Sequence, residues 1–162
     1  MFKVQPTDVD AGEIRLKVEI NCKEHFSVFP MVKVPFAVEN SWFKGSCEVL
    51  TYDLAELMGT KLRAVYQRRK GRDLFDLWKI LSMVPELDKE KVMQSYERYL
   101  GFTASRLPTY KEFVLNMEGK LQDEEFLTDT DMILNPSIEY NPATAWEKVK
   151  EELVERLIKE GK

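Results

Sequence analysis

Alternating apolar and charged residues over 13–20 predict a β-strand with one buried face. The apolar positions of this strand are Ile14, Leu16, Val18 and Ile20. Two further short strands are expected at 31–38 and 47–52, where proline and glycine interrupt the chain. Residues 1–52 are therefore expected to form part of a small sheet, and its polar face needs another element to cover or extend it.

From residue 53 onward the apolar positions recur every three or four residues, which predicts helices. Asp53 followed by Glu56 has the spacing of a capping box at the start of a helix that runs to about residue 69. Further helices are expected over 72–83, 88–100, from 108, over 122–134, and from the Asn141-Pro142 pair with Trp146, Val149, Leu153 and Leu157 on its inner face. The predicted fold class is α+β, with a small partial sheet in residues 1–52 followed by a helical bundle in residues 53–162.

Composition limits the chemistry that the chain can perform. The 162 residues include 24 Lys and Arg, 28 Asp and Glu, two cysteines and one histidine. The single histidine excludes most Ser-His-Asp, Cys-His and multi-histidine metal sites, and two cysteines are too few for a disulfide framework. No apolar run reaches the roughly 20 residues that a membrane helix needs, so we expect no membrane association and a cytoplasmic location.

The charge is unevenly distributed, because residues 61–72 carry six basic side chains and no acidic one. On one continuous helix Lys61, Arg68 and Arg72 would lie close to a single line, and they could bind one polyanion together. Such a run repels itself unless an anion neutralises it, which favours a phosphate-binding site.

A second interpretation of the basic run remains open. Arg69 with Asp73, and Arg72 with Asp76, have the i, i+4 spacing of ordinary surface ion pairs on a helix. In that case the run is a solvated face with no ligand.

Lys17 and Glu19 form another candidate pair, because residues two apart on a strand project from the same face. A carboxylate in this position can hold Mg²⁺ on a triphosphate, and the lysine can neutralise phosphate charge. The alternative is that both side chains simply face solvent.

Three segments resemble the AbiEii/AbiGii-type nucleotidyltransferase-like toxins of type IV toxin-antitoxin and abortive-infection systems. They are RLKVEIN at 15–21, DLAELMGTKLRAVYQRRKGRDLFDLW at 53–78, and a tail that contains KLQDEEF and the Asn-Pro-Ala helix start at 141–143. The resemblance implies a polymerase-β-like nucleotidyltransferase sheet followed by a helical domain. It also implies transfer of a nucleotide from an NTP to an acceptor, which is tRNA in some relatives.

The resemblance also implies roles for individual residues. Lys17 matches the lysine of the third family motif and would contact the nucleotide phosphates, while Glu19 falls where the third carboxylate of the superfamily would lie. Asp73 matches the catalytic acidic residue of the fourth motif, which Arg72 and Asp76 share. Asp76 would be a structural partner of the basic helix. The predicted substrate-binding residues are Glu19, Lys61, Arg68, Arg69, Arg72 and Asp76, and no metal ligand is predicted.

The sequence departs from the family pattern ahead of Lys17. Members carry a Gly-Gly or Gly-Ser loop and an Asp-x-Asp pair many residues before the lysine motif, whereas sixteen residues precede Lys17 here. The pairs Asp8/Asp10, Asp129/Asp131 and Gly45/Ser46 are interpreted as turn or helix-surface residues, because neither their spacing nor their context suits a metal or phosphate motif.

We therefore expect the chain to correspond to the C-terminal portion of such an enzyme and to be inactive alone, with NTP and Mg²⁺ used only when a complementing N-terminal half is present. The alternatives are a non-catalytic module that binds nucleotide or RNA, or a module that binds a partner. Expected partners are the complementing half, a cognate antitoxin, or a second copy paired through the open sheet.

Overall fold

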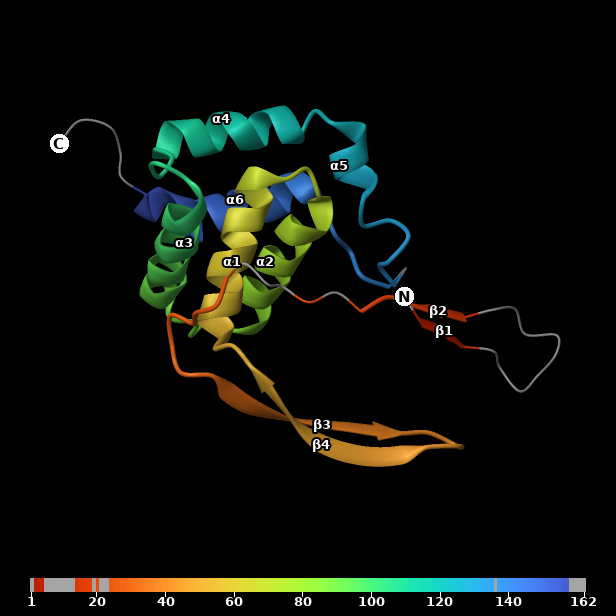
Figure 1. The fold of residues 1–162 in the computed structure, drawn as a ribbon. Helices are drawn as coiled ribbons and strands as arrows, with labels where there is room; N and C mark the ends of the chain where they lie inside the picture. The colour runs from red at the N-terminus through yellow and green to blue at the C-terminus, as the bar shows by residue number, and fades with distance from the viewer. Residues whose placement is uncertain (1, 5–13, 19, 21–23, 136, 158–162) are drawn as a thin grey trace.

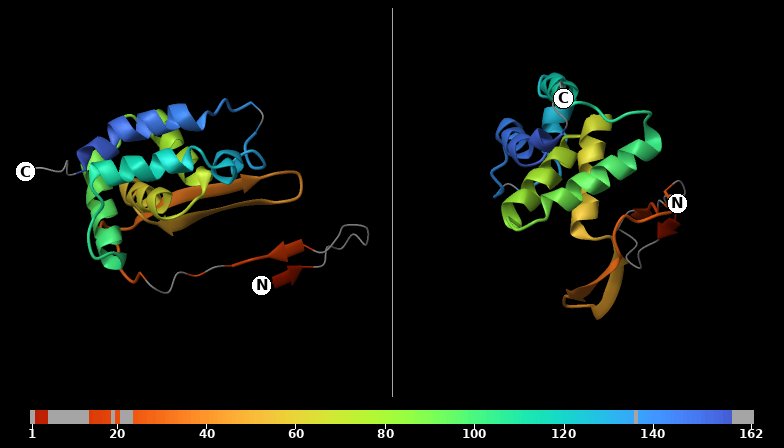
Figure 2. Two further views of the ribbon diagram at one scale, coloured as in Figure 1. Left: turned by 90° about the horizontal axis from the view of Figure 1, so that it is seen from above. Right: turned by 90° about the vertical axis from the view of Figure 1, so that its left-hand side faces the viewer.

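The computed structural model describes residues 2–4, 14–18, 20, 24–135 and 137–157. Two antiparallel hairpins precede a helical bundle (Figure 1), so the α+β class is confirmed. In the first hairpin β1 (Phe2–Val4) pairs with β2 (Ile14–Leu16), and in the second β3 (Val32–Glu39) pairs with β4 (Lys44–Thr51). Figures 1 and 2 show the β1–β2 hairpin standing apart from the helices.

The strand predictions hold for the second hairpin and need correction for the first. The predicted strands 31–38 and 47–52 correspond to β3 and β4. The strand predicted over 13–20 forms regular structure only over Ile14–Leu16 within the described residues. Val18 and Ile20 are 56% and 80% exposed, so the expected buried face does not extend to them.

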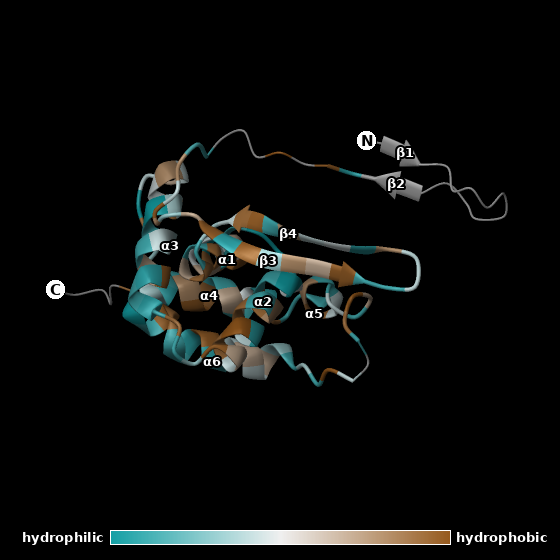
Figure 3. Ribbon diagram, turned by 90° about the horizontal axis from the view of Figure 1, so that it is seen from below, coloured by the Kyte–Doolittle hydropathy of each residue, from teal (hydrophilic) through white to brown (hydrophobic). Residues whose placement is uncertain are grey.

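The β3–β4 hairpin exposes an apolar face. Val32, Val34 and Phe36 alternate along β3 and are between 37% and 55% exposed, and Val49 lies opposite Val34 on β4. Figure 3 shows hydrophobic residues along β3. Two strands alone cannot bury one of their faces, because burial needs a second layer. Trp42, in the turn of the hairpin, is 85% exposed.

The helices follow one another with short connections. They are α1 (Leu54–Gln67), α2 (Gly71–Met83), α3 (Lys89–Thr103), α4 (Tyr110–Lys120), α5 (Glu124–Thr128) and α6 (Pro142–Glu152), followed by a 3₁₀ turn (Val154–Arg156). The helix predicted over 122–134 is therefore wrong beyond Thr128, and residues 129–133 form turns. Asp129 turns back to bind the start of α2, as described below.

The predicted start of α6 is confirmed, whereas the capping box predicted for α1 is not formed. Asn141 accepts a hydrogen bond from Thr144 N at 3.0 Å with Pro142 in the first turn, as predicted for α6. Asp53 caps α1 by accepting from Ala55 N at 2.8 Å. Glu56 does not complete a capping box, because its carboxylate is buried and accepts from Val28 N and Phe29 N instead.

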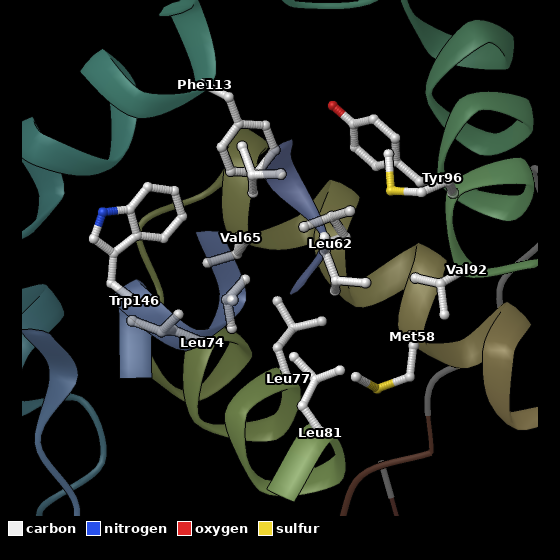
Figure 4. Close-up of a cluster of buried hydrophobic side chains, with 14 of the residues drawn as sticks. Met58, Leu62, Val65, Leu74, Leu77, Leu81, Val92, Tyr96, Phe113 and Trp146 are labelled. Atoms are coloured by element: carbon white, nitrogen blue, oxygen red, sulfur yellow. The ribbon is translucent and has the colours of Figure 1, made fainter. Parts of the chain in front are cut away.

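Helix α1 lies at the centre of the bundle, packed against α2 and α3. Figure 4 shows side chains from several helices meeting around Leu62 and Val65, and both of these residues are fully buried. Trp146 from α6 is 3% exposed, in agreement with the predicted inner face of the last helix. Within the described parts of the chain, the helices are too short or too polar to span a bilayer.

Candidate functional site

The basic run lies at the junction of α1 and α2. Helix α1 ends at Gln67, Arg68 adopts an extended backbone with φ −127° and ψ 162°, and α2 starts at Gly71. The run is thus divided between two helices and a short link. A single continuous helix, on which Lys61, Arg68 and Arg72 would share one line, is therefore not formed.

Asp73 lies at the centre of an ion-pair network formed by α1 and α2. Its side chain is fully buried, and Arg68 donates to both carboxylate oxygens, from Nε at 2.6 Å and from Nη2 at 2.8 Å. Lys61 Nζ lies 3.3 Å from Asp73 Oδ1 and 2.6 Å from Asp76 Oδ2. The structure therefore brings together four of the predicted site residues.

The electrostatics of this network hold both cations in the charged state. Burial lowers the pKa of Lys61, but the neighbouring carboxylates of Asp76 and Asp73 outweigh burial, and the net pKa is raised. The hydrogen bond to Asp73 raises the pKa of Arg68. The two carboxylate oxygens of Asp73 accept from three N–H groups of Arg68 and Lys61, and Asp73 thereby orients both cations.

The C-terminal part of the basic run, from Arg69 to Arg72, is bound to α5, to its N-cap Asp123 and to the turn after it. Arg69 pairs with Asp123 at 2.9 Å and Lys70 pairs with Glu125 at 2.8 Å. Asp129 accepts from Arg72 N at 3.1 Å, and its carboxylate also lies 3.8 Å from Lys70 Nζ and 3.9 Å from Arg72 Nη1. Carboxylates of the same chain therefore supply the anions that the run needs.

These contacts correct the ion pairs that the i, i+4 spacing predicted for the run. The i, i+4 spacing suggested the pairs Arg69–Asp73 and Arg72–Asp76. Instead, the two arginines pair with carboxylates about 55 residues away in the sequence. The two aspartates pair with Lys61 and Arg68. Arg69 is 73% exposed and Arg72 49% exposed, so both still reach solvent.

Lys17 lies outside this network. Lys17 is exposed on the segment after β2, whose hairpin stands apart from α2 in Figures 1 and 2. The structure does not bring Lys17 to Asp73. Glu19 falls outside the described residues.

A pocket of about 440 Å³ lies beside the network, along the outer face of α1. Lys61 and Arg68 line it together with Arg63, a residue that the sequence analysis did not select. Arg63 forms an ion pair with Glu24 and lies over the Tyr99 ring, 5.4 Å from its centroid. No periodicity connects residues 24, 63 and 99, so local sequence patterns could not have found this arrangement.

Lys120 of α4 is a buried cation behind the basic run. It is 5% exposed, and its Nζ donates to the Val65 and Tyr66 carbonyls near the end of α1. Burial, helped by the nearby Arg69, lowers the pKa of Lys120 to about 8. A neutral amine still has two hydrogens, which suffice for both carbonyls.

We expect the free energy of unfolding to rise with pH between pH 8 and 10, because the pKa of Lys120 is lowered in the folded state. In this window the unfolded lysine, with a pKa of about 10.4, holds a proton that the folded one has released, so the free energy of unfolding rises with pH, by up to about 3 kcal/mol. Above about pH 10 the gain reverses, because burial raises the pKa values of Tyr96, Tyr99 and Tyr140 in the folded state. Urea unfolding at several pH values measures this. Lys120→Met should flatten the rise, and an equal rise in that variant would contradict the assignment.

Comparison with known proteins gives one family match. The model of a family described as "Nucleotidyl transferase AbiEii toxin, Type IV TA system" matches residues 2–152, which include the buried network, the basic run and α5. No curated protein and no solved structure matches the chain.

Proposed function

The chain belongs to the AbiEii nucleotidyltransferase toxin family of type IV toxin-antitoxin systems, and we propose that it acts in NTP-dependent transfer of a nucleotide to an acceptor such as RNA. The observation that carries this proposal is the buried Asp73 of the RRKGRDLFDLW motif, held by two cations at the edge of a pocket. Burying a carboxylate is costly unless it is paired, and such networks are concentrated at functional sites.

The described residues do not fit the two Mg²⁺ ions that nucleotidyl transfer uses. Asp73 has its oxygens occupied by Arg68 and Lys61, and the described residues contain no group of three or more His, Cys, Asp or Glu that could hold a metal ion. We propose that a complementing polypeptide supplies the metal-binding carboxylates.

In this proposal Asp73 is a positioning residue. It fixes the side chains of Arg68 and Lys61, whose positive charges face the phosphates of the substrate. Lys17, by its match to the family lysine, would reach the same phosphates once the complete centre is assembled. Asp76 holds Lys61 from the solvent side.

The test is a transfer assay with labelled NTP, Mg²⁺ and RNA. We expect transfer only when the chain is mixed with a polypeptide that carries the family Gly-Gly loop and Asp-x-Asp strand. Lys17→Ala and Asp73→Asn should each lower the rate by about 100-fold. The first removes a positive charge at the reacting phosphates, and the second removes the carboxylate that orients Arg68 and Lys61.

Arg106→Ala is the matched control, because Arg106 pairs with Glu112 away from the pocket and should leave the rate unchanged. A mixture that transfers equally well with Lys17→Ala and Asp73→Asn would overturn the proposed roles. A complete absence of transfer with every nucleotide and complementing polypeptide would overturn the function itself.

The exposed apolar face of β3–β4 favours a second candidate function, that of a partner-binding module. The family description places the toxin in a type IV toxin-antitoxin system, which implies an antitoxin partner. Apolar patches on a protein surface commonly mark interaction sites. Co-purification with a cognate antitoxin expressed together with the chain, lost on Phe36→Asp, would support this function, and retention by that variant would contradict it.

A further inference from the structure

Helix α1 ends without a cation of its own. Its last turn reads Ala-Val-Tyr-Gln over residues 64–67, and Arg68 already has an extended backbone. The last carbonyls of a helix have no partner within the helix, and they attract positive charge because the helix dipole is negative at this end. Val65 is fully buried, so another part of the chain has to supply a donor for its carbonyl.

Lys120, the last residue of α4, supplies this donor. Its side chain is 5% exposed, and its Nζ donates to Val65 O and, at 2.7 Å, to Tyr66 O. Figure 1 shows α4 lying across the end of α1, and the Phe113 ring of α4 packs against the Tyr66 ring with centroids 5.0 Å apart. The buried lysine therefore caps α1 from a helix about 55 residues later in the sequence.

The two carbonyls that Lys120 occupies are the ones that a longer α1 would use. In an α-helix the carbonyl of residue i accepts from the N–H of residue i+4, so Val65 O and Tyr66 O would accept from the amides of residues 69 and 70. Lys120 satisfies both carbonyls without those amides. The helix then gains less from a further turn, because each added residue contributes one such hydrogen bond.

The position of the Arg68 side chain depends on where α1 ends. On a continuous helix residues five apart lie about 140° from each other around the axis, so Arg68 and Asp73 would point in different directions. The break in the helix lets Arg68 reach the buried carboxylate, with Nε at 2.6 Å and Nη2 at 2.8 Å. The end of α1 and this ion pair therefore depend on each other.

We propose that Lys120 is a positioning residue that ends α1 at Gln67 and thereby places Arg68 against Asp73. Its two hydrogen bonds are to backbone carbonyls, so it acts through the course of the chain. That the placement of Arg68 serves nucleotide transfer rests on the proposed function. The placement itself can be measured without any transfer.

Hydrogen exchange measured by NMR tests the placement. In Lys120→Met, which removes the donors and keeps a long side chain, the Arg68 Nε–H should exchange at least about tenfold faster, because its ion pair opens more often. The amide of Leu62, a fully buried residue of α1, reports global unfolding. A role in stability alone would speed exchange at Leu62 and leave the local opening at Arg68 unchanged.

Lys111→Met is the matched control, because Lys111 is an exposed lysine of the same helix and should leave both rates unchanged. Lys120→Gln keeps two N–H donors on a shorter side chain and should recover most of the protection at Arg68. In the wild type, a scalar coupling should join Lys120 Nζ to the Val65 and Tyr66 carbonyl carbons, whether or not Lys120→Met folds. Absence of that coupling, or unchanged exchange at Arg68 in Lys120→Met, overturns the proposal.

A double-mutant cycle in the complemented transfer assay tests the consequence for function. Lys120→Met should lower the transfer rate by about tenfold in the wild type and by less than about twofold in the Arg68→Ala background, because the lysine acts through Arg68. Equal losses in both backgrounds would overturn the positioning role in transfer. If no complementing polypeptide gives transfer, the proposed function fails, and the exchange rates still decide whether Lys120 places Arg68.

Discussion

Gly59→Ala is expected to lower the free energy of unfolding by about 3 kcal/mol, because α1 and α3 pack too closely there for a methyl group. An added Cβ would lie 2.5 Å from Ser95 Cβ and 2.7 Å from both Tyr96 N and Val92 O. Two of these atoms belong to the backbone of α3, so the helices must separate. Thermal unfolding should show a midpoint about 10 °C lower.

Gly101 and Gly119 provide matched controls, because each lies in a helix and an added Cβ would meet no atom within 4 Å. Their replacement by alanine should raise the free energy of unfolding by up to about 1 kcal/mol, through helix propensity alone. If Gly59→Ala behaved like these two, the close approach of α1 and α3 would be wrong.

Glu56→Ala is expected to destabilise the protein by about 4 kcal/mol, since it removes the acceptor for one buried hydroxyl and two partly buried amides. The carboxylate accepts from Val28 N at 2.8 Å, from Phe29 N at 2.9 Å and from the Tyr99 hydroxyl at 2.7 Å. Each unpaired donor costs about 1–3 kcal/mol when buried. Urea unfolding measures the total, and faster hydrogen exchange of the Val28 and Phe29 amides would localise the loss.

Replacing Glu97, an exposed acid on α3, by alanine controls for the change of charge and should alter stability by less than about 0.5 kcal/mol. Glu56→Gln retains one acceptor oxygen and should fall between the two variants. Unchanged exchange at Val28 and Phe29 in Glu56→Ala would contradict the role of Glu56 as the anchor of this segment.

The helices could be predicted from the sequence because their determinants are local. The apolar stripe of α1, and Asn141-Pro142 at the start of α6, act over one or two turns of chain. The strand predicted over 13–20 is longer than the observed β2. The alternation of apolar and charged residues reflects one strand alone, whereas the length of a paired strand also depends on its partner. Here the three residues of β1 pair with β2.

The candidate site could be predicted only in part. The basic run selected Arg68 and the resemblance selected Asp73, which the structure joins, and the family match confirms the resemblance. Glu56 fitted a capping box by spacing, but its buried carboxylate accepts from two partly buried amides, of residues 28 and 29, instead. Likewise Arg63 depends on Glu24, 39 residues earlier in the sequence, and no local pattern encodes that contact.

The pairing of the basic run with α5 has a consequence for how the protein folds. Until residues 123–129 dock, Arg69, Lys70 and Arg72 lack the carboxylates that neutralise them and repel one another at the end of α1. Contacts so distant in sequence form late, after the loop between them has closed. Added salt should therefore accelerate refolding by screening this repulsion, while weakening the finished ion pairs and so speeding unfolding.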